Sequence, residues 1–338
     1  MKKINTLLAI LVLTTTIANA KIWRVNNNSG ITADYTTVQA AHDAASAGDT
    51  IHLEPSGTSY GNLTMTKRLV LVSSGAYITE NPGFQASSNS GYLSTLTIAN
   101  TGANGSVIMV KFSGDVNISN NVGNLLLQSC VTNYTGGAHF CCGYAGNINI
   151  SNADNIIIKN SYVNNIYFSS NSNNIVIVNN IISNGVGCTS DCDGTIANNI
   201  IHANWTQNAS STLYNCTVEN NIYNYGVQGS FGSCLVRNNL NSNTGLPAGN
   251  GNQNSVNMTN VFVNRAVGYG GADNAYVLKS GSPAIGAGSG GIDCGAFGGS
   301  TPFKLAVTPP IPSIYKLEVP STPAGNTMNI KFSTRSNN

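Results

Sequence analysis

Three segments in the middle of the chain, Ile175–Ser183 (IVIVNNIIS), Gly194–His202 (GTIANNIIH) and Cys216–Asn224 (CTVENNIYN), repeat one pattern and decide the fold. Three further copies begin at Leu125, Ile156 and Cys234. The longer interval between the first two copies includes an extra Gly-rich stretch, 136–146. The other copies follow one another at a nearly constant interval, which together with short alternating strands and polar corners is typical of a β-solenoid.

Each copy places the same kind of residue at the same position. The third residue is aliphatic: Leu127, Ile158, Ile177, Ile196, Val218 and Val236. Three places later, at the corner, stand Cys130, Ser161, Asn180, Asn199, Asn221 and Asn239. Since no single copy can bury its own apolar face, we expect the copies to stack about 4.8 Å apart with the aliphatic column inside. We expect the corner asparagines to form a ladder, each side-chain amide bonding the amides above and below it.

Composition excludes several classes of protein. The 338 residues include 51 Asn and 36 Gly, carry a net charge of +2, and are only 8% charged, against about 25% in ordinary soluble domains. This excludes a charged disordered tail, a coiled coil and a basic nucleic-acid-binding protein. Asn and Gly tolerate left-handed backbone conformations, so the composition favours strands joined by many tight corners.

The N-terminus has the pattern of a secretory signal peptide. Lys2 and Lys3 precede an apolar run, Leu7–Leu13, which is followed by Ala18-Asn19-Ala20. We predict cleavage after Ala20 and a secreted or cell-surface location. No later stretch of the sequence is apolar for long enough to cross a bilayer as a helix, so we expect no membrane span after cleavage.

The two ends of the remaining chain differ from the repeats. The segment Tyr35–Ala47 has a short helical stripe, and we expect this helix to cover the open end of the solenoid. After Thr301, prolines 309, 310 and 312 form a stiff linker. Ile314–Val319 and Met328–Phe332 then alternate like two short strands. The predicted domains are a signal peptide (1–20), a β-helix (21–302), and a Pro-rich linker with a short strand tail (303–338).

Two motifs carry a family resemblance. The order TVQAAHDAASAGDTI, from Thr37, resembles the entry to right-handed parallel β-helix proteins of the pectate-lyase-like superfamily. Ser282-Pro283-Ala284-Ile285, Gly288 and Ile292-Asp293-Cys294-Gly295-Ala296-Phe297 resemble the closing motif of secreted bacterial β-helices. The resemblance covers about residues 33 to 300. The chain departs from the motif at Gly286, where an acid is frequent, and at Cys294, where an aliphatic residue is usual.

We therefore predict an all-β fold: a right-handed parallel β-helix (solenoid) with a short N-terminal helical cap and a C-terminal strand tail. A sandwich of short, evenly spaced strands is the main alternative, and the fixed Asn columns argue against it. The resemblance implies relatives that cleave polysaccharides, either lyases or hydrolases.

Candidate catalytic residues lie on one outward column of the repeats: Gln128, Lys159, Val178, Ala197, Glu219 and Arg237. Lys159, Glu219 and Arg237 could form a catalytic or sugar-binding face, because a lyase needs cations and a base. The other interpretation of Glu219 and Arg237 is a solvated ion pair on a sheet surface.

Three more ionisable residues lie in loops. Asp191 and Asp193, in CTSDCDG, could act as paired acids or bind Ca²⁺, or could be ordinary turn residues. Cys188 and Cys192 flank this acidic segment and could close a small disulfide loop. His139, in the Gly-rich stretch 136–146, could be a base. No cofactor is certain, and Ca²⁺ is the cation that the acidic pair would take.

Aromatic residues offer sugar-stacking platforms, and the candidates are Trp205, Tyr223 and Tyr225. We expect His202, which follows the Asn corner, to face solvent. The expected partner is a polysaccharide or a cell-surface glycan. Because carboxylates and bases are few on the repeats, we favour a non-catalytic surface, adhesive or glycan-binding protein. A polysaccharide lyase (pectate-lyase-like) or glycoside hydrolase remains the alternative.

Overall fold

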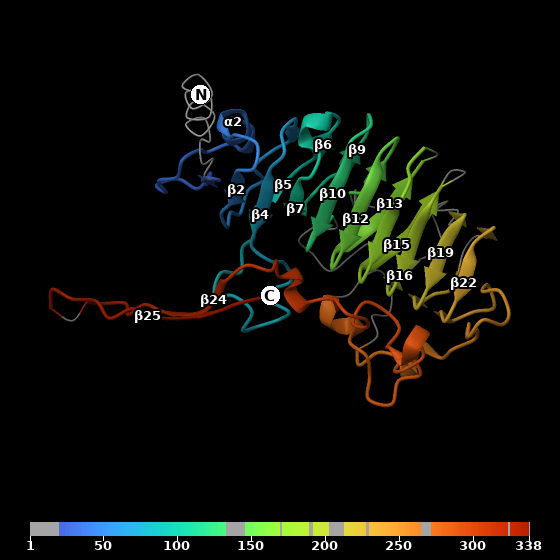
Figure 1. The fold of residues 1–338 in the computed structure, drawn as a ribbon. Coiled ribbons are helices and arrows are strands. Elements are labelled where there is room, and N and C mark those ends of the chain that lie inside the picture. Colours follow the sequence, from blue (N-terminus) through green and yellow to red (C-terminus); the bar gives the residue numbers. More distant parts are fainter. Residues whose placement is uncertain are drawn as a thin grey trace, which may run out of the picture.

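The structure is a computed structural model that describes residues 20–132, 146–169, 171–188, 192–202, 213–227, 230–264, 272–323 and 325–337. Over these ranges the chain is a right-handed parallel β-helix with one short α-helix and a C-terminal antiparallel strand pair (Figure 1), as predicted. Two long parallel sheets, named sheet A and sheet B here, form the solenoid.

Sheet A has ten strands, in spatial order β1 (Ile22–Val25), β2 (Thr50–Leu53), β4 (Val70–Ser73), β7 (Val107–Met109), β10 (Gly123–Gln128), β12 (Asp154–Lys159), β14 (Ile175–Val178), β16 (Gly194–Ala197), β19 (Cys216–Glu219) and β22 (Leu235–Arg237). Sheet B has nine, β3 (Leu63–Met65), β6 (Leu96–Ile98), β9 (Val116–Ile118), β11 (Ile148–Ile150), β13 (Tyr162–Phe168), β15 (Ile181–Cys188), β17 (Ile200–Ile201), β20 (Ile222–Tyr223) and β23 (Leu240–Asn241). Short parallel pairs join β5 (Tyr92–Leu93) to β8 (Lys111–Phe112) and β18 (Leu213–Tyr214) to β21 (Phe231–Gly232).

The core follows the period-2 alternation of the repeats. The predicted inward column of sheet A, Leu127, Ile158, Ile177, Ile196, Val218 and Val236, is between 0 and 4% exposed. The register places these residues directly above one another, for example Ile177 beside Ile196. The predicted strand phase is therefore confirmed, because alternate side chains of a strand point to opposite faces of the sheet.

The corner after each of the six repeat strands of sheet A is built from a pair of residues, most of them asparagines. The first member adopts φ between +49° and +57°, which Asn tolerates better than most residues: Ser129, Asn160, Asn179, Asn198, Asn220 and Asn238. The second member is fully buried and belongs to the predicted ladder. Asn180 Nδ2 donates to Asn199 Oδ1 (3.1 Å), and Asn239 Nδ2 donates to Asn252 Oδ1 (3.1 Å). The ladder thus extends one residue beyond the predicted column.

The N-terminal end is covered by α2 (Val38–Ala44), inside the segment predicted to be helical. Thr37 caps this helix by accepting a hydrogen bond from the Ala40 amide (3.4 Å). Its buried face, Val38 and Ala41, packs on the first coil. Elsewhere the described residues form short 3₁₀ helices: η1 (Thr101–Ala103), η2 (Met258–Asn260), η3 (Asp273–Tyr276), η4 (Ser289–Gly291) and η5 (Leu305–Val307).

Residues 272–308 are named the strap here. The strap begins beside its own end, where the Ala306 amide donates to Asp273 Oδ2 (2.6 Å), and from Ala287 onward it runs back along the solenoid from the last coils toward the first (Figure 1). The corner residues with positive φ attach the strap to the solenoid, because their side-chain amides donate hydrogen bonds to strap carbonyls. Asn238 Nδ2 donates to Ala287 O (3.2 Å), Asn198 Nδ2 to Asp293 O (3.2 Å) and Asn160 Nδ2 to Thr301 O (2.8 Å). This part of the predicted β-helix domain, 21–302, covers the solenoid from outside.

Under the strap lies a second apolar cluster. It combines an outward column of the solenoid with apolar strap residues, so both are buried: Val131, Tyr162, Ile181, Ile200, Ile222 and Leu240 from the coils, and Tyr276, Ala284, Cys294, Ala296, Phe303 and Val307 from the strap. The closing motif that carried the family resemblance supplies three of these side chains. Burial explains Cys294, because a small thiol fills an apolar site as a small hydrophobe does.

The tail ends in an antiparallel hairpin of β24 (Ser313–Glu318) and β25 (Lys331–Arg335), which projects from the body (Figure 1). The first strand matches the predicted segment, whereas the second begins later than predicted, at Lys331. Leu317 pairs with Phe332, and both are more than half exposed. No helix in the described ranges is long and apolar enough to cross a membrane.

Candidate functional site

The ionisable column predicted on sheet A does face outward. Lys159 ends β12, Glu219 ends β19 and Arg237 ends β22. Arg237 Nε donates to Glu219 Oε2 (2.7 Å) across adjacent strands. Lys159 lies three strands from Glu219, about 14 Å at the usual strand spacing. The fold brings together two of the three side chains, and those two are paired with each other.

The predicted loop residues are only partly described. Asp193 is exposed, and its backbone carbonyl accepts a hydrogen bond from the Ile175 amide (3.1 Å). Cys188 and Cys192 form a disulfide, as expected. Asp191, His139 and Trp205 lie outside the described residues. Among those that are described, no three His, Cys, Asp or Glu side chains gather into a group that could hold a metal ion.

Tyr223 and His202, which were both predicted to lie at the surface, are buried. Tyr223 lies within the β-helix core, where burial raises its pKa, so its ring face is not free to stack on a sugar. His202 was expected to face solvent, but the strap covers it, and its Nδ1 lies 2.9 Å from both the Tyr276 hydroxyl and Asn224 Nδ2. Tyr225 is half-buried and packs edge-on against His202, with ring centroids 4.7 Å apart. Sequence periodicity could not reveal that His202 is buried, because the strap that covers it is remote in the chain.

The outer face of sheet A is a long, regular surface that spans ten strands of the described structure. One of its two columns contains only aliphatic residues and threonine across all ten strands: Ile22, Thr50, Val70, Val107, Leu126, Ile157, Val176, Thr195, Thr217 and Leu235. Each is exposed or half-exposed. At the usual strand spacing the column is roughly 40 Å long.

The second outward column contains Arg24, His52, Val72, Met109, Gln128, Lys159, Val178, Ala197, Glu219 and Arg237. Its charges are concentrated near the two ends, with Lys159 between them. Arg24 is paired with Glu54 and Arg237 with Glu219, which leaves the middle of the face nearly uncharged. Val72, Met109 and Ala197 of this second column are buried, whereas every residue of the first column keeps solvent exposure. Parallel sheets are usually covered on both faces, so a solvent-exposed aliphatic column of this length is a candidate binding surface.

Sheet B offers a contrast. Its corresponding outward column begins with Thr64, Thr97, Asn117 and Asn149, and the last two are hydrogen-bonded to each other (2.9 Å). This face is polar, as expected for a solvated surface. The aliphatic character is therefore a property of sheet A and is not shared by the whole solenoid.

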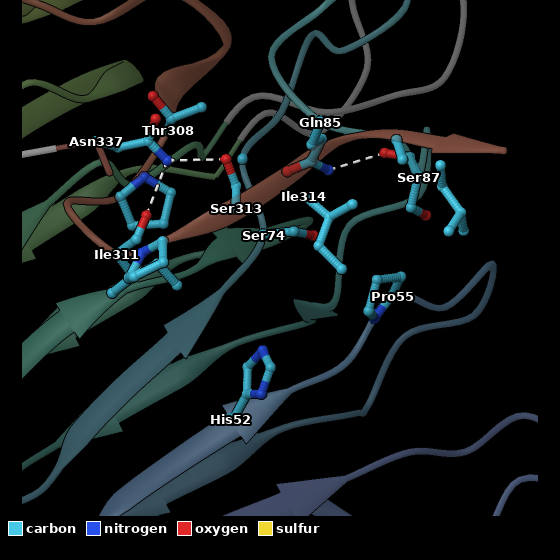
Figure 2. Close-up of a pocket in the computed structure, with 15 residues that line it drawn as sticks. His52, Pro55, Ser74, Gln85, Ser87, Thr308, Ile311, Ser313, Ile314 and Asn337 are labelled. Carbon is cyan, nitrogen blue, oxygen red and sulfur yellow. Dashed lines mark hydrogen bonds between the residues drawn. The ribbon is translucent and has the colours of Figure 1, made fainter. Parts of the chain in front are cut away.

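A pocket of about 510 Å³ lies beside the first strands of sheet A, between the solenoid and the C-terminal segment (Figure 2). His52 of β2 and Pro55 form one side, and Ile311, Ile314 and Leu317 form the other. Polar side chains at its margin already have partners: Asn337 Nδ2 donates to Ile311 O (2.8 Å) and to Ser313 Oγ (3.1 Å), and Gln85 Nε2 donates to Ser87 O (2.9 Å). The volume suits a small apolar group.

Two basic groups near this end have lowered pKa values. Burial lowers the pKa of His52, so its imidazole is neutral at pH 7. Burial also lowers the pKa of Lys111, on β8, to about 8, and its ammonium lies 5.2 Å from the centroid of the Tyr92 ring. Neither His52 nor Lys111 lies within the repeating copies, so no sequence pattern pointed to them.

The aliphatic column was not among the predicted sites, although six of its ten residues belong to the repeating copies. The second residue of each copy is Leu126, Ile157, Val176, Thr195, Thr217 or Leu235, and strand alternation places all six outward. The continuation of the column through β1, β2, β4 and β7 contains no sequence repeat, so only the register of these strands reveals it.

The fold is consistent with that of pectate-lyase-like proteins. No protein-family model matches the chain, and no curated protein shows significant similarity to it.

Proposed function

We propose that this chain is an exported, non-catalytic β-helix protein of the pectate-lyase-like superfamily that binds a neutral polysaccharide on the outer face of sheet A. One observation carries the proposal: a ten-strand column of aliphatic residues and threonine that is open to solvent. Export rests on the signal-peptide pattern that ends at Ala20.

The chemistry of the face favours a flat, uncharged ligand. Ordered polysaccharide chains present C–H groups and hydroxyls at regular intervals. Aliphatic side chains such as Val176 can contact the C–H groups, and Thr195, Thr217 and Gln128 can exchange hydrogen bonds with the hydroxyls. An acidic polysaccharide would need free cations, and among the described residues along the middle of this face Lys159 alone supplies one.

A panel of insoluble and soluble polysaccharides tests the proposal. The full chain should sediment with at least one neutral insoluble polysaccharide and release neither unsaturated products nor reducing ends. A variant with Thr195→Glu and Thr217→Glu places two charges on adjacent strands of the face and should lose at least tenfold in affinity. Thr64→Glu with Thr97→Glu, adjacent on sheet B, is the matched control and should bind normally.

Equal binding by the two double variants would show that the face is not the site. Absence of binding to every neutral polysaccharide in the panel would reject the proposal.

A second candidate function, cleavage of an acidic polysaccharide, is favoured by one observation. Lys111, whose pKa burial lowers to about 8, lies over the Tyr92 ring and is only 6% exposed, so it could act as a base for a sugar that enters this buried site. If the chain releases unsaturated products, and Lys111→Met abolishes that turnover while circular dichroism shows an intact fold, the enzymatic function replaces the binding function.

A further inference from the structure

Two cysteines stack on neighbouring strands at the C-terminal end of sheet A. The register pairs Thr217 with Leu235, which places Cys216 of β19 beside Cys234. The Cys216 backbone amide donates to the Cys234 sulfur (3.4 Å). Neighbouring strands lie about 4.8 Å apart, within the Cα separation of roughly 4.4 to 6.8 Å that a disulfide spans. A disulfide between the two residues therefore lies within the Cα spacing that neighbouring strands provide.

The two thiols differ in exposure and in acidity. Cys216 is buried in the β-helix core, whereas Cys234 is half-buried at its margin. The interaction with the Cys216 side chain, together with the hydrogen bond from the Cys216 backbone amide, lowers the pKa of Cys234. The same interaction, together with burial, raises the pKa of Cys216. A reagent in solvent can therefore reach Cys234, whose thiolate is the nucleophile of the pair. Cys216 lies beside it, deeper in the core.

We propose that Cys216 and Cys234 form a redox-active dithiol, which a small-molecule disulfide converts into a disulfide bond between β19 and β22. The Cys234 thiolate attacks one sulfur of the oxidant, giving a mixed disulfide and releasing one thiolate. Cys216 then gives up its proton to solvent and attacks the Cys234 sulfur, which releases the second thiolate. Two electrons and two protons pass from the protein to the oxidant, which leaves as two thiols.

The remaining described cysteines provide internal controls. Cys188 and Cys192 are already joined to each other. Cys130 and Cys294 are buried, and burial raises the pKa of each to about 12. Their sulfurs donate to backbone carbonyls, as those of Cys216 and Cys234 also do, so exposure is what distinguishes the half-buried Cys234 from them. Neither should react at neutral pH in the folded protein.

The test uses the full chain in glutathione buffers of defined ratio, followed by acid quenching, alkylation and peptide mapping by mass spectrometry without reduction. We expect a linked peptide pair containing Cys216 and Cys234 that grows with the oxidised fraction. Before oxidation, alkylation at pH 7 should modify Cys234 at least tenfold faster than Cys130 or Cys294. Cys216→Ser should trap glutathione on Cys234, whereas Cys234→Ser should leave Cys216 unmodified.

Two results would overturn the proposal. One is absence of the linked peptide at every glutathione ratio, with no trapped glutathione in Cys216→Ser. The other is alkylation of Cys234 at the rate of Cys130 in the folded protein. Cys294→Ser, checked by circular dichroism beside the other variants, shows whether loss of a buried thiol by itself disturbs the fold.

Discussion

Asn199 and Asn221, which occupy the same corner of successive coils, are joined by two hydrogen bonds to a single oxygen. Asn221 Oδ1 accepts from the Asn199 backbone amide (2.8 Å) and from Asn199 Nδ2 (3.0 Å). The Asn221 amide nitrogen in turn donates to Ile196 O (2.8 Å) and to Asn239 Oδ1 (3.0 Å). The buried amides of this corner are therefore satisfied by the coils above and below it.

Replacing one ladder residue should weaken the solenoid strongly. Asn221→Ala removes the acceptor of the Asn199 backbone amide and the side-chain donor to the Ile196 carbonyl in a buried site, so we expect a loss of about 3 kcal/mol in the free energy of unfolding. Urea unfolding measures it. Asn117→Ala removes an amide from the outer face of sheet B and should cost less than about 1 kcal/mol. Similar costs for the two variants would mean that the ladder is dispensable.

Ile196 points into the core and Glu219 points outward, and a second pair of variants tests this assignment. Ile196 is fully buried, so Ile196→Asp places an unpaired charge in the core and should cost at least about 4 kcal/mol or prevent folding. Glu219→Ala breaks only a partly exposed ion pair and should cost about 1 kcal/mol or less. Thermal melting of both variants checks the phase. Equal melting shifts would show that it is reversed.

The attachment of the strap can be tested at a left-handed corner. Asn179 Nδ2 donates to Ala296 O (3.0 Å) and Gly298 O (2.7 Å), and its φ is +55°. Asn179→Gly keeps the backbone conformation but removes both bonds, so we expect faster hydrogen exchange in strap residues 294–303. Asn174, with φ +54°, is exposed and donates to Asn155 instead of the strap, so Asn174→Gly is the matched control. Unchanged exchange in Asn179→Gly would contradict this role.

Stability should rise as the pH falls from 7 toward 5. Burial raises the pKa of Asp273, at the start of the strap, from 3.8 to about 6. A carboxyl whose folded pKa is raised contributes stability that is complete below its unfolded pKa and is lost as the pH rises through the folded pKa. The difference between the two pKa values corresponds to roughly 3 kcal/mol between the protonated and ionised limits.

Melting temperature measured against pH checks this, with Asp273→Asn as the comparison. The variant should gain no stability between pH 7 and 5, because the amide does not titrate and His52, whose pKa burial lowers, favours unfolding as the pH falls. A wild-type curve that falls with acidification over the same range would contradict the prediction. Below about pH 4 other carboxyls take over, because hydrogen bonds lower the pKa of Asp49 and Glu54.

The repeating part of the fold followed from the sequence alone. Alternation within each copy set the inward column that contains Ile177 and Ile196, and the fixed corner position set the ladder through Asn199 and Asn221. Both are local patterns that recur at a nearly constant interval, so stacking the copies turns a sequence column into a spatial one. The helical cap and the first tail strand were also visible as local patterns.

Tertiary structure alone decided which outward columns are covered and which are open. Ile200 and Ile222 point away from the core yet are buried, because the strap, which comes much later in the chain, lies on them. The column through Val176 and Thr195 stays open, and its continuation to Ile22 depends on the register of coils that carry no repeat. Periodicity records the direction of a side chain relative to its own strand, but coverage depends on contacts between distant segments, which no local pattern encodes.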